Sequence, residues 1–345
     1  MSFVEVTRGG ITESRHRVRL CVSDARGTLV ASVGDVAAPA FYRSAAKPFQ
    51  ALPLVEEGIV RGLGLTPPEL ALCCGSHEGT RAHVAVTHSI LAKAGVDERS
   101  LQCGPHLPYS DSAARALRDS GAGPSPAHNN CSGKHAGMLA LAVGMGWDPV
   151  DYHRADHPVQ RRMLHEVARW SGIPEEEIET AIDGCGIPCF AVGLGAMATS
   201  FAHFAAAAAH GECPAHIVEA MTAHPLMVGG EGRACTDVME STGGRVFVKL
   251  GAEGVYGGGI PGRELGFAIK VEDGGRRAVE VALVHLLVEL GVLRPSEVAA
   301  LKAHGRPEVR NTRGEVVGEI RPAFFLEGVS RRTPSSPAPT LVREP

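Results

Sequence analysis

The residues whose types and spacing could do chemistry begin with Ser44 and Lys47, three positions apart. Positions i and i+3 share one face of a helix, so the serine hydroxyl and the lysine amine could touch. A lysine takes a proton from serine only when it is neutral, which requires burial or a nearby positive charge to lower its pKa. Arg43 is a candidate for that charge. By itself, the pair is equally compatible with a capping serine followed by a solvated lysine.

A second serine and a second lysine stand in chemically suggestive places. Ser76 lies in the glycine-flanked segment 75–79, after an apolar run, where backbone can approach a ligand closely. An ordinary turn with a capping serine explains the same pattern. Lys249 lies near the end of a predicted strand at 245–254. The chain has 6 lysines against 28 arginines, and arginine cannot be deprotonated, so each retained lysine is informative about proton transfer.

The densest polar cluster, residues 128–135, runs directly into a predicted apolar helix at 136–143. It is not a phosphate loop, because His128 stands where the first glycine is needed and His135 where serine or threonine is needed. Cys131, His135 and His128 are plausible metal ligands. Cys185, flanked by glycines, could join Cys131 on one metal, although a buried free thiol is the commoner role of a cysteine.

Two other sequence patterns carry less chemistry. Gly257, Gly259 and Gly262 match a dinucleotide fingerprint only formally, because residues 265–271 after them alternate as a strand instead of opening a helix. These glycines predict a hairpin. A polar loop at 229–237 separates two predicted elements and has no assigned role.

Composition limits the class of protein. A chain of 345 residues with 44% hydrophobic and 21% charged residues is typical of a globular protein. The formal net charge of −4, without a basic stripe, argues against binding to nucleic acid or anionic membranes. The N-terminus lacks the features of a signal peptide, and the apolar run 190–209 is typical of a buried core helix. Nine irregularly spaced cysteines indicate reduced thiols, so we expect a cytoplasmic protein.

Strand patterns occur at both ends of the chain, among them residues 4–7 and 17–23, and most helical patterns lie between the ends. Apolar spacing predicts helices at 84–94, at 156–171 and, nearer the C-terminal end, at 279–290. The ends therefore predict one mostly antiparallel sheet, from about 1–43 and 245–325, with a helical part at about 44–244 against it. We expect a single compact unit over 1–328 and a disordered tail at 329–345. Pro53 should kink or end the helix that begins at Lys47.

Five motifs follow one another in a specific order: Arg43-Ser44-x-x-Lys47 and the segments 74–79, 129–135, 183–186 and 249–254. Together they resemble the bacterial asparaginase group typified by the inducible Rhizobium etli enzyme, which is distinct from the threonine-nucleophile asparaginases. The resemblance implies an α/β (α+β) fold like that of serine β-lactamases and penicillin-binding proteins. It also implies a homodimer that hydrolyses L-asparagine to L-aspartate and ammonia.

The same resemblance implies roles for individual residues. Ser44 with Lys47, and Ser76 with Lys249, would be two serine–lysine pairs. In the mechanism we expect, Ser44 attacks the carboxamide, neutral Lys47 takes its proton, and the second pair relays the proton or activates the deacylating water. The reverse assignment, with Ser76 as the nucleophile, is chemically equivalent.

The resemblance further implies a zinc site held by Cys131, Lys134 and Cys185, with water as the fourth ligand. Spacing alone would favour His135 over Lys134. Such a zinc ion would position the amino-acid end of the substrate and need not generate hydroxide, since a serine nucleophile is present. Three further residues would line the substrate pocket: Arg43, His135 and Asp183.

Two alternative functions stay open. One is a penicillin-interacting serine hydrolase, which shares the S-x-x-K motif, although the usual S-D-N and K-T-G partners are missing. The other is a non-catalytic, zinc-dependent binding protein that uses the same pocket.

Overall fold

The computed structural model describes residues 2–328. The predicted disordered tail at 329–345 lies outside the described residues. No helix within 2–328 is both long enough and apolar enough to span a lipid bilayer.

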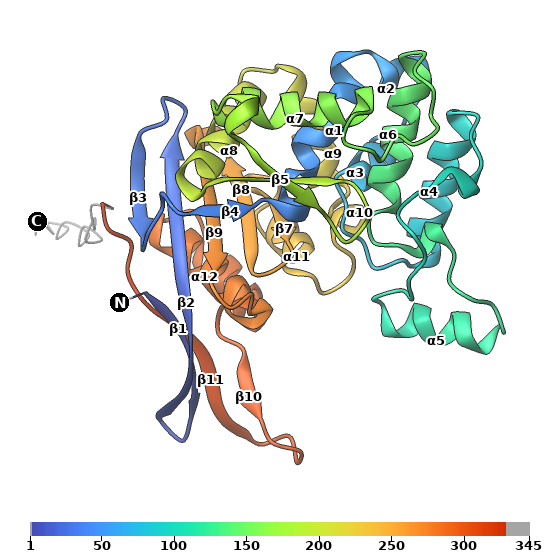
Figure 1. Ribbon diagram of the computed structural model, residues 1–345. Coiled ribbons are helices and arrows are strands. Elements are labelled where there is room, and N and C mark those ends of the chain that lie inside the picture. The colour runs from blue at the N-terminus through green and yellow to red at the C-terminus, as the bar shows by residue number, and fades with distance from the viewer. Residues whose placement is uncertain (1, 329–345) are drawn as a thin grey trace, which may run out of the picture.

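An antiparallel sheet joins the two ends of the chain (Figure 1). Its strands follow the order β10-β11-β1-β2-β9-β8-β7, and β3 pairs with part of β2. The prediction of a mostly antiparallel sheet shared by both ends is confirmed. The strands are β1 (Phe3–Arg8), β2 (Ile11–Asp24), β3 (Leu29–Val33), β7 (Phe247–Gly251), β8 (Val255–Ile260), β9 (Leu265–Val271), β10 (Glu308–Arg310) and β11 (Val316–Ala323).

The strand β2 is longer than predicted because its first half belongs to a charged arm. This half pairs with β1, and β1 pairs with β11, so the arm extends below the body in Figure 1. Ion pairs from Arg15 and Arg321 to the same carboxylate, Glu5, link the three strands. The polar and charged residues at 12–17 leave this half of β2 without an apolar face, which is why the apolar pattern predicted a strand only at residues 17–23.

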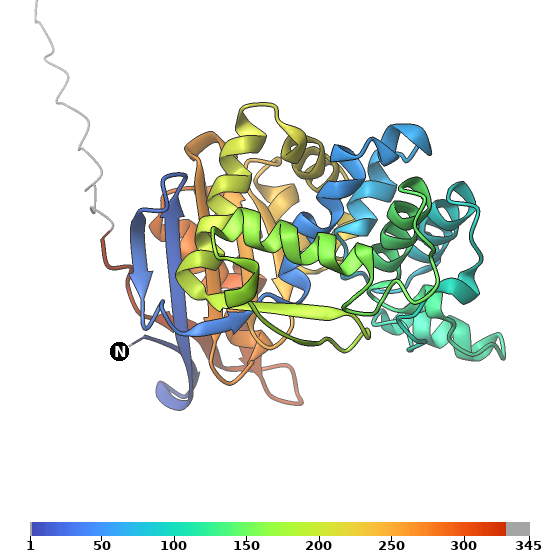
Figure 2. The ribbon, with the colours of Figure 1, turned by 45° about the horizontal axis from the view of Figure 1, so that its top comes forward.

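Helices occupy most of the chain between β3 and β7, and Figure 2 shows them beside and in front of the sheet. The first helix continues past Pro53 to Glu56, so the expectation of an early end is wrong. The helices are α1 (Lys47–Glu56), α2 (Ile59–Gly62), α3 (Pro67–Cys73), α4 (Arg81–Lys93), α5 (Asp111–Asp119), α6 (Ser132–Gly144), α7 (Pro158–Ser171), α8 (Leu194–Ala209), α9 (Cys213–Ala223), α10 (Pro225–Val228), α11 (Ala234–Ser241), α12 (Arg276–Glu289), α13 (Pro295–Ala300) and α14 (Lys302–Gly305).

A second sheet has three strands, two of which lie inside the part predicted to be helical. It consists of β4 (Pro39–Phe41), β6 (Pro188–Gly193) and β5 (Glu179–Ile182), paired in that order. The apolar run 190–209 therefore divides between β6 and α8, which corrects its interpretation as one helix. This sheet places the loop after β5 beside the segment after β4, where Tyr42 N donates to Phe190 O at 2.9 Å.

The main sheet is covered on both faces, with α8 in front of it and α12 behind it in Figure 2. Glycines in β8 and β9 allow α8 to approach closely. A Cβ on Gly266 would lie 2.0 Å from Ala202 N, and one on Gly257 would lie 2.0 Å from the ring of Phe201. Two of the three fingerprint glycines thus have a packing cause, because a Cβ on Gly259 would likewise lie 2.9 Å from Ala205 Cβ, whereas Gly262 has open space around it.

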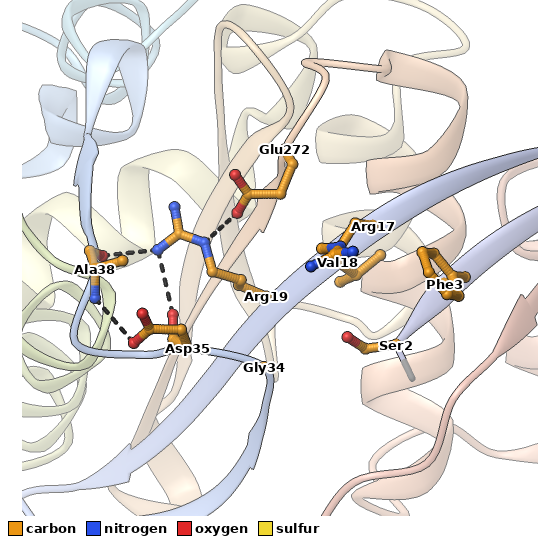
Figure 3. A pocket seen from close by; sticks show the side chains of 9 residues that line it. All are labelled: Ser2, Phe3, Arg17, Val18, Arg19, Gly34, Asp35, Ala38 and Glu272. Atoms are coloured by element: carbon orange, nitrogen blue, oxygen red, sulfur yellow. Dashed lines mark hydrogen bonds and ion pairs between the residues drawn. The ribbon is translucent and has the colours of Figure 1, made fainter.

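Arg19 of β2 lies in the wall of a pocket at the sheet end of the molecule (Figure 3). The buried guanidinium pairs with Glu272 and donates to the carbonyl oxygens of Ala38, at 2.7 Å, and Asp35, at 3.3 Å. These bonds hold the segment that leads into β4 and then into the turn carrying Ser44. Because this arginine is fully engaged, we assign the pocket a structural role.

Candidate active site

Both candidate lysines reach the same hydroxyl, that of Ser76. Lys47 Nζ lies 3.0 Å from Ser76 Oγ, and Lys249 Nζ lies 2.9 Å from it. Lys47 is the first residue of α1, Ser76 follows α3, and Lys249 lies in the middle of β7. Both lysines are buried, at 1% and 0% exposure. Three segments far apart in the sequence thus form one buried hydrogen-bonded group.

Each lysine has further partners that fix its position. Lys47 also donates to Gly75 O and contacts Cys131 Sγ at 3.3 Å, and Lys249 also donates to Leu250 O at 2.9 Å. These contacts satisfy amine hydrogens that would otherwise be buried without partners.

Burial is the main cause that lowers the pKa of Lys249 to about 8, and the charge of Lys47 lowers it further against the raising effect of Cys235. Because both lysines contact one hydroxyl, their nitrogens lie at most about 6 Å apart, where repulsion at an effective dielectric of 20 is about 3 kcal/mol. Lys249 is therefore an amine that can be neutral near physiological pH.

Ser44 lies in a 3₁₀ turn, Arg43–Ala46, directly before α1. The hydrogen bonds of Lys47 go elsewhere, and within residues 2–328 none joins it to the hydroxyl of Ser44. The turn does pack against the end of β7, because a Cβ on Gly251 would lie 2.6 Å from Tyr42 O. The pairing of Ser44 with Lys47 stays a prediction, while the turn carrying Ser44 lies near the strand carrying Lys249.

Cys131, Cys185 and Lys134 form a second buried cluster, joined to the first through Lys47. The two cysteine side chains share a hydrogen bond, and Lys134 Nζ donates to Cys185 Sγ at 3.0 Å. The bond from Cys185, together with the nearby ammonium groups, lowers the pKa of Cys131 well below its ordinary value despite burial. The same bond and burial raise the pKa of Cys185, so Cys131 is the sulfur of the pair that loses its proton more readily.

The chemistry of this cluster fits zinc through its two sulfurs, which are preferred zinc ligands. The third donor would have to be the amine of Lys134 after loss of a proton. Burial lowers the pKa of Lys134, but the two sulfurs outweigh it and raise the pKa above its ordinary value. The ammonium of Lys134 thus occupies the place of a cation beside the sulfurs, and a metal ion would have to displace its proton.

The histidines do not join the two cysteines. Among residues 2–328, no three histidine, cysteine or acidic side chains gather in a way that could hold a metal ion. Nδ1 of His128 accepts from Ser125 N, and Nδ1 of His135 contacts the Tyr152 hydroxyl at 2.6 Å. The expectation from spacing that His128 and His135 would bind a metal with Cys131 is therefore wrong.

The residues predicted to line the substrate pocket are close to the cysteine cluster but already have partners. Arg43 is bound to Asp183 at 2.8 Å, so a carboxylate balances its charge. Burial raises the pKa of Asp183, but Lys134 and Arg43 together outweigh it and lower the pKa. His135 is buried, which lowers its pKa well below the ordinary value, and its Nε2 has no partner within the described residues.

A cavity of about 300 Å³ opens beside Ser76 and Lys249. The sequence did not predict an ion pair that involves the cavity residue Arg233, in which Arg233 Nε donates to Glu78 Oε1 at 2.5 Å. The only signals were the charged, glycine-rich loops that carry the two residues. The cavity is lined by Ser76, Tyr109, Asn130, Val228, Gly229, Arg233, Ala234, Cys235, Lys249, Leu250, Tyr256 and Arg276.

Fold and site together describe an α+β protein in which a serine hydroxyl beside a small polar cavity contacts two buried lysines. The chain belongs to the L-asparaginase II family, whose model matches residues 4–322. This membership supports asparagine-hydrolysing amidohydrolase activity in general, with a small-molecule substrate.

Two other comparisons add little to the family match. No curated protein matches the chain. Among solved structures, the chain is similar to one titled "Crystal Structure Analysis of Mglu in its native form", with a TM-score of 0.36 and 17% identity. That similarity covers 82% of this chain and 67% of the other.

Proposed function

We propose that the protein hydrolyses L-asparagine to L-aspartate and ammonia, with a serine as nucleophile and lysines as proton acceptors. The observation that carries the proposal is the contact of two buried lysines with one serine hydroxyl, one of them with a pKa near 8. A carboxamide needs a nucleophile, a base for its proton and a proton donor for the leaving ammonia. The family supplies the substrate class.

In the proposed reaction, Lys47 first gives up a proton, and Ser44 Oγ then attacks the carboxamide carbon as its own proton passes to the Lys47 amine. The protonated amine then donates to the departing nitrogen, which leaves as ammonia, and an acyl ester remains on the serine. Water hydrolyses this ester to aspartate and restores the serine hydroxyl. The turn carrying Ser44 and the strand carrying Lys249 lie together, which supports this assignment.

Ser76 would act as the proton relay between the two lysines. Its oxygen lies within 3.0 Å of both amines, so it can accept a hydrogen bond from one and donate to the other. Lys249, whose pKa is about 8, would accept through Ser76 the proton that Lys47 gives up before the attack, and Lys47 would then carry the nucleophile's proton to the departing nitrogen.

The same contacts favour a second assignment, in which Ser76 itself attacks. Its hydroxyl touches both amines and lines the cavity, whereas no hydrogen bond among residues 2–328 joins Ser44 to a lysine side chain. The relay and direct attack differ only in which serine carries the acyl group.

The decisive experiment is ammonia release from asparagine by wild type, Ser44→Ala and Ser76→Ala, with the exposed Ser120→Ala as control. The proposal expects Ser44→Ala to lose turnover. Substantial activity in Ser44→Ala, with an acyl group found on the Ser76 peptide by mass spectrometry after an acid quench, would move the nucleophile to Ser76. Absence of ammonia release in the wild type would refute the function.

Glutamine and β-aspartyl compounds, tested in the same assay, define the substrate range. One extra methylene changes selectivity by only about 1–3 kcal/mol, so glutamine is a demanding comparison. Turnover of a chromogenic β-lactam, without ammonia release from asparagine, would instead favour the penicillin-interacting hydrolase.

We also propose zinc as a ligand of Cys131, Lys134 and Cys185, where a bound zinc ion would polarise and position substrate groups. These residues would hold it through two sulfurs and one neutral amine. Metal analysis tests this directly: the wild type should bind one equivalent of zinc, and Cys185→Ser should bind much less. Equal zinc content in both proteins would exclude the site. The β-lactamase-like assignment of the fold, the homodimer and the cytoplasmic location stay predictions.

A further inference from the structure

Arg233 differs from Arg43, the arginine beside the cysteine cluster, because the guanidinium of Arg233 keeps open positions. Its Nε donates to Glu78, and within residues 2–328 no hydrogen bond holds its two terminal nitrogens. Arg43, by contrast, engages Asp183 through both Nε and Nη2. A guanidinium held at one edge with two terminal nitrogens open has the geometry that binds a carboxylate through two hydrogen bonds.

The position of Arg233 is set by tight packing around Glu78. Gly230 has a φ of 113°, and a Cβ there would lie 2.4 Å from Glu78 Cγ, so only glycine allows this approach. Glu78 lies two residues after Ser76, and its carbonyl oxygen accepts a hydrogen bond from Ser110 N at 3.2 Å. The loop that presents the serine therefore also orients the arginine.

Other cations in the cavity wall are less suited to bind a carboxylate. Lys249 is hydrogen-bonded to Ser76 and Leu250 O. Arg276 is 54% exposed and pairs with Glu280 at 3.1 Å, so water screens its charge. Arg233 is only 19% exposed, and it lines the same cavity as Ser76.

We propose that Arg233 binds the α-carboxylate of the substrate and that Glu78 positions Arg233. The inference rests on the proposed amide hydrolysis and extends it to the substrate class, which is amino acids with a side-chain amide and a free α-carboxylate. In asparagine only the α and β carbons separate the carboxylate from the amide carbon. A carboxylate anchored at Arg233 therefore presents the amide within the same small cavity that Ser76 and Lys249 line, which fits the second assignment, in which Ser76 attacks.

The test compares asparagine with 3-aminopropanamide, which is asparagine without its carboxylate. In the wild type, kcat/KM should be at least about a hundredfold higher for asparagine. Arg233→Met should lower kcat/KM for asparagine about a hundredfold, mainly through KM, and change that for 3-aminopropanamide less than threefold. Arg154→Met, which removes an exposed arginine outside the cavity wall, should change neither value.

Four further variants separate substrate binding from a structural role. Glu78→Gln keeps an oxygen for Arg233 Nε and should retain preference for asparagine, whereas Glu78→Ala should lose most of it. Arg233→Lys keeps a charge without the planar fork and should recover only part of the preference. Added guanidinium ion, at concentrations that leave the fold intact, should restore asparagine turnover in Arg233→Ala more than turnover of 3-aminopropanamide.

The outcomes distinguish the inference from the function on which it rests. If Arg233→Met loses activity equally on both amides while the wild type hydrolyses asparagine, the function stands and the carboxylate role is wrong. If the wild type hydrolyses neither amide, the function fails, and calorimetric titration with L-aspartate then tests the arginine alone. Binding at least tenfold weaker in Arg233→Met would support the carboxylate role, and equal or absent binding would overturn it.

Discussion

Burial of Lys249 predicts a specific dependence of stability on pH. Folding lowers the pKa of this lysine from 10.5 to about 8, mainly because the amine is buried. Between these two values the unfolded chain binds more protons than the folded chain, so stability must rise as the pH rises. The difference corresponds to about 3 kcal/mol of stability gained by pH 10.5. Below pH 8 the amine is charged in both states, and the destabilisation is fully present.

Lys249→Met removes the titrating amine and keeps an apolar side chain of similar length. Urea unfolding should show that, between pH 7 and pH 10.5, the free energy of unfolding rises by about 3 kcal/mol more in the wild type than in the variant. Cysteines and tyrosines titrate in both proteins and largely cancel in the comparison. Lys302→Met, which removes an exposed lysine, should behave like the wild type.

The refuting result is an identical pH dependence in the wild type and Lys249→Met. It would mean that the amine keeps an ordinary pKa in the folded protein. Lys249 could then not serve as a base near neutral pH, and the proposed proton relay would lose its acceptor.

Three other predictions concern activity, pH and packing. Lys249→Arg introduces a cation that cannot be deprotonated, so this variant should hydrolyse asparagine at least about a thousandfold more slowly than the wild type at every pH between 6 and 10. The wild-type rate should rise with pH and show an inflection near pH 8. A flat wild-type profile would argue against this base. His304, between Glu280 and Asp237, has a pKa raised above 6.5, chiefly by its hydrogen bond to Glu280, so its stabilisation is complete below pH 6.5 and is lost as the pH rises through the folded pKa. His304→Gln should therefore lower the melting temperature more at pH 6 than at pH 9, and an equal decrease would contradict the assignment. Gly230→Ala should lower the free energy of unfolding by about 1–3 kcal/mol, measured by chemical denaturation, and should raise KM for asparagine. Gly232→Ala, where the Cβ would enter open space, should leave KM unchanged.

Local patterns along the sequence were sufficient for much of the fold. Alternating apolar and polar residues in the regions of β2 and β9 predicted strands, because alternation places the apolar side chains on one face, which must be buried. Helical spacing predicted α4, α7 and α12 to within a few residues. The small sheet containing β5 and β6 was missed, because an apolar run of that length reads equally well as the start of a buried helix.

The candidate site was accessible from the sequence only as a set of residue types. A serine beside glycines, scarce lysines and two cysteines near polar clusters indicated hydrolytic or metal chemistry, because these side chains can become nucleophiles, bases or soft ligands. Residue types also suggested contacts that the tertiary structure does not contain. His128 caps a short turn instead of binding a metal, and Arg43 is neutralised by Asp183.

Which groups meet was decided by tertiary structure. Lys47 lies three residues from Ser44 but hydrogen-bonds to Ser76, 29 positions away, and Lys249 reaches the same oxygen from 173 positions away. The low pKa of Lys249 likewise comes from burial and from a neighbouring ammonium, neither of which is encoded by the residues beside it in the chain. Sequence determined the chemical groups and the periodicity of the elements. Proton affinity and carboxylate recognition depend on distance and solvent exclusion, which arise only when α1, the loop after α3 and β7 pack together.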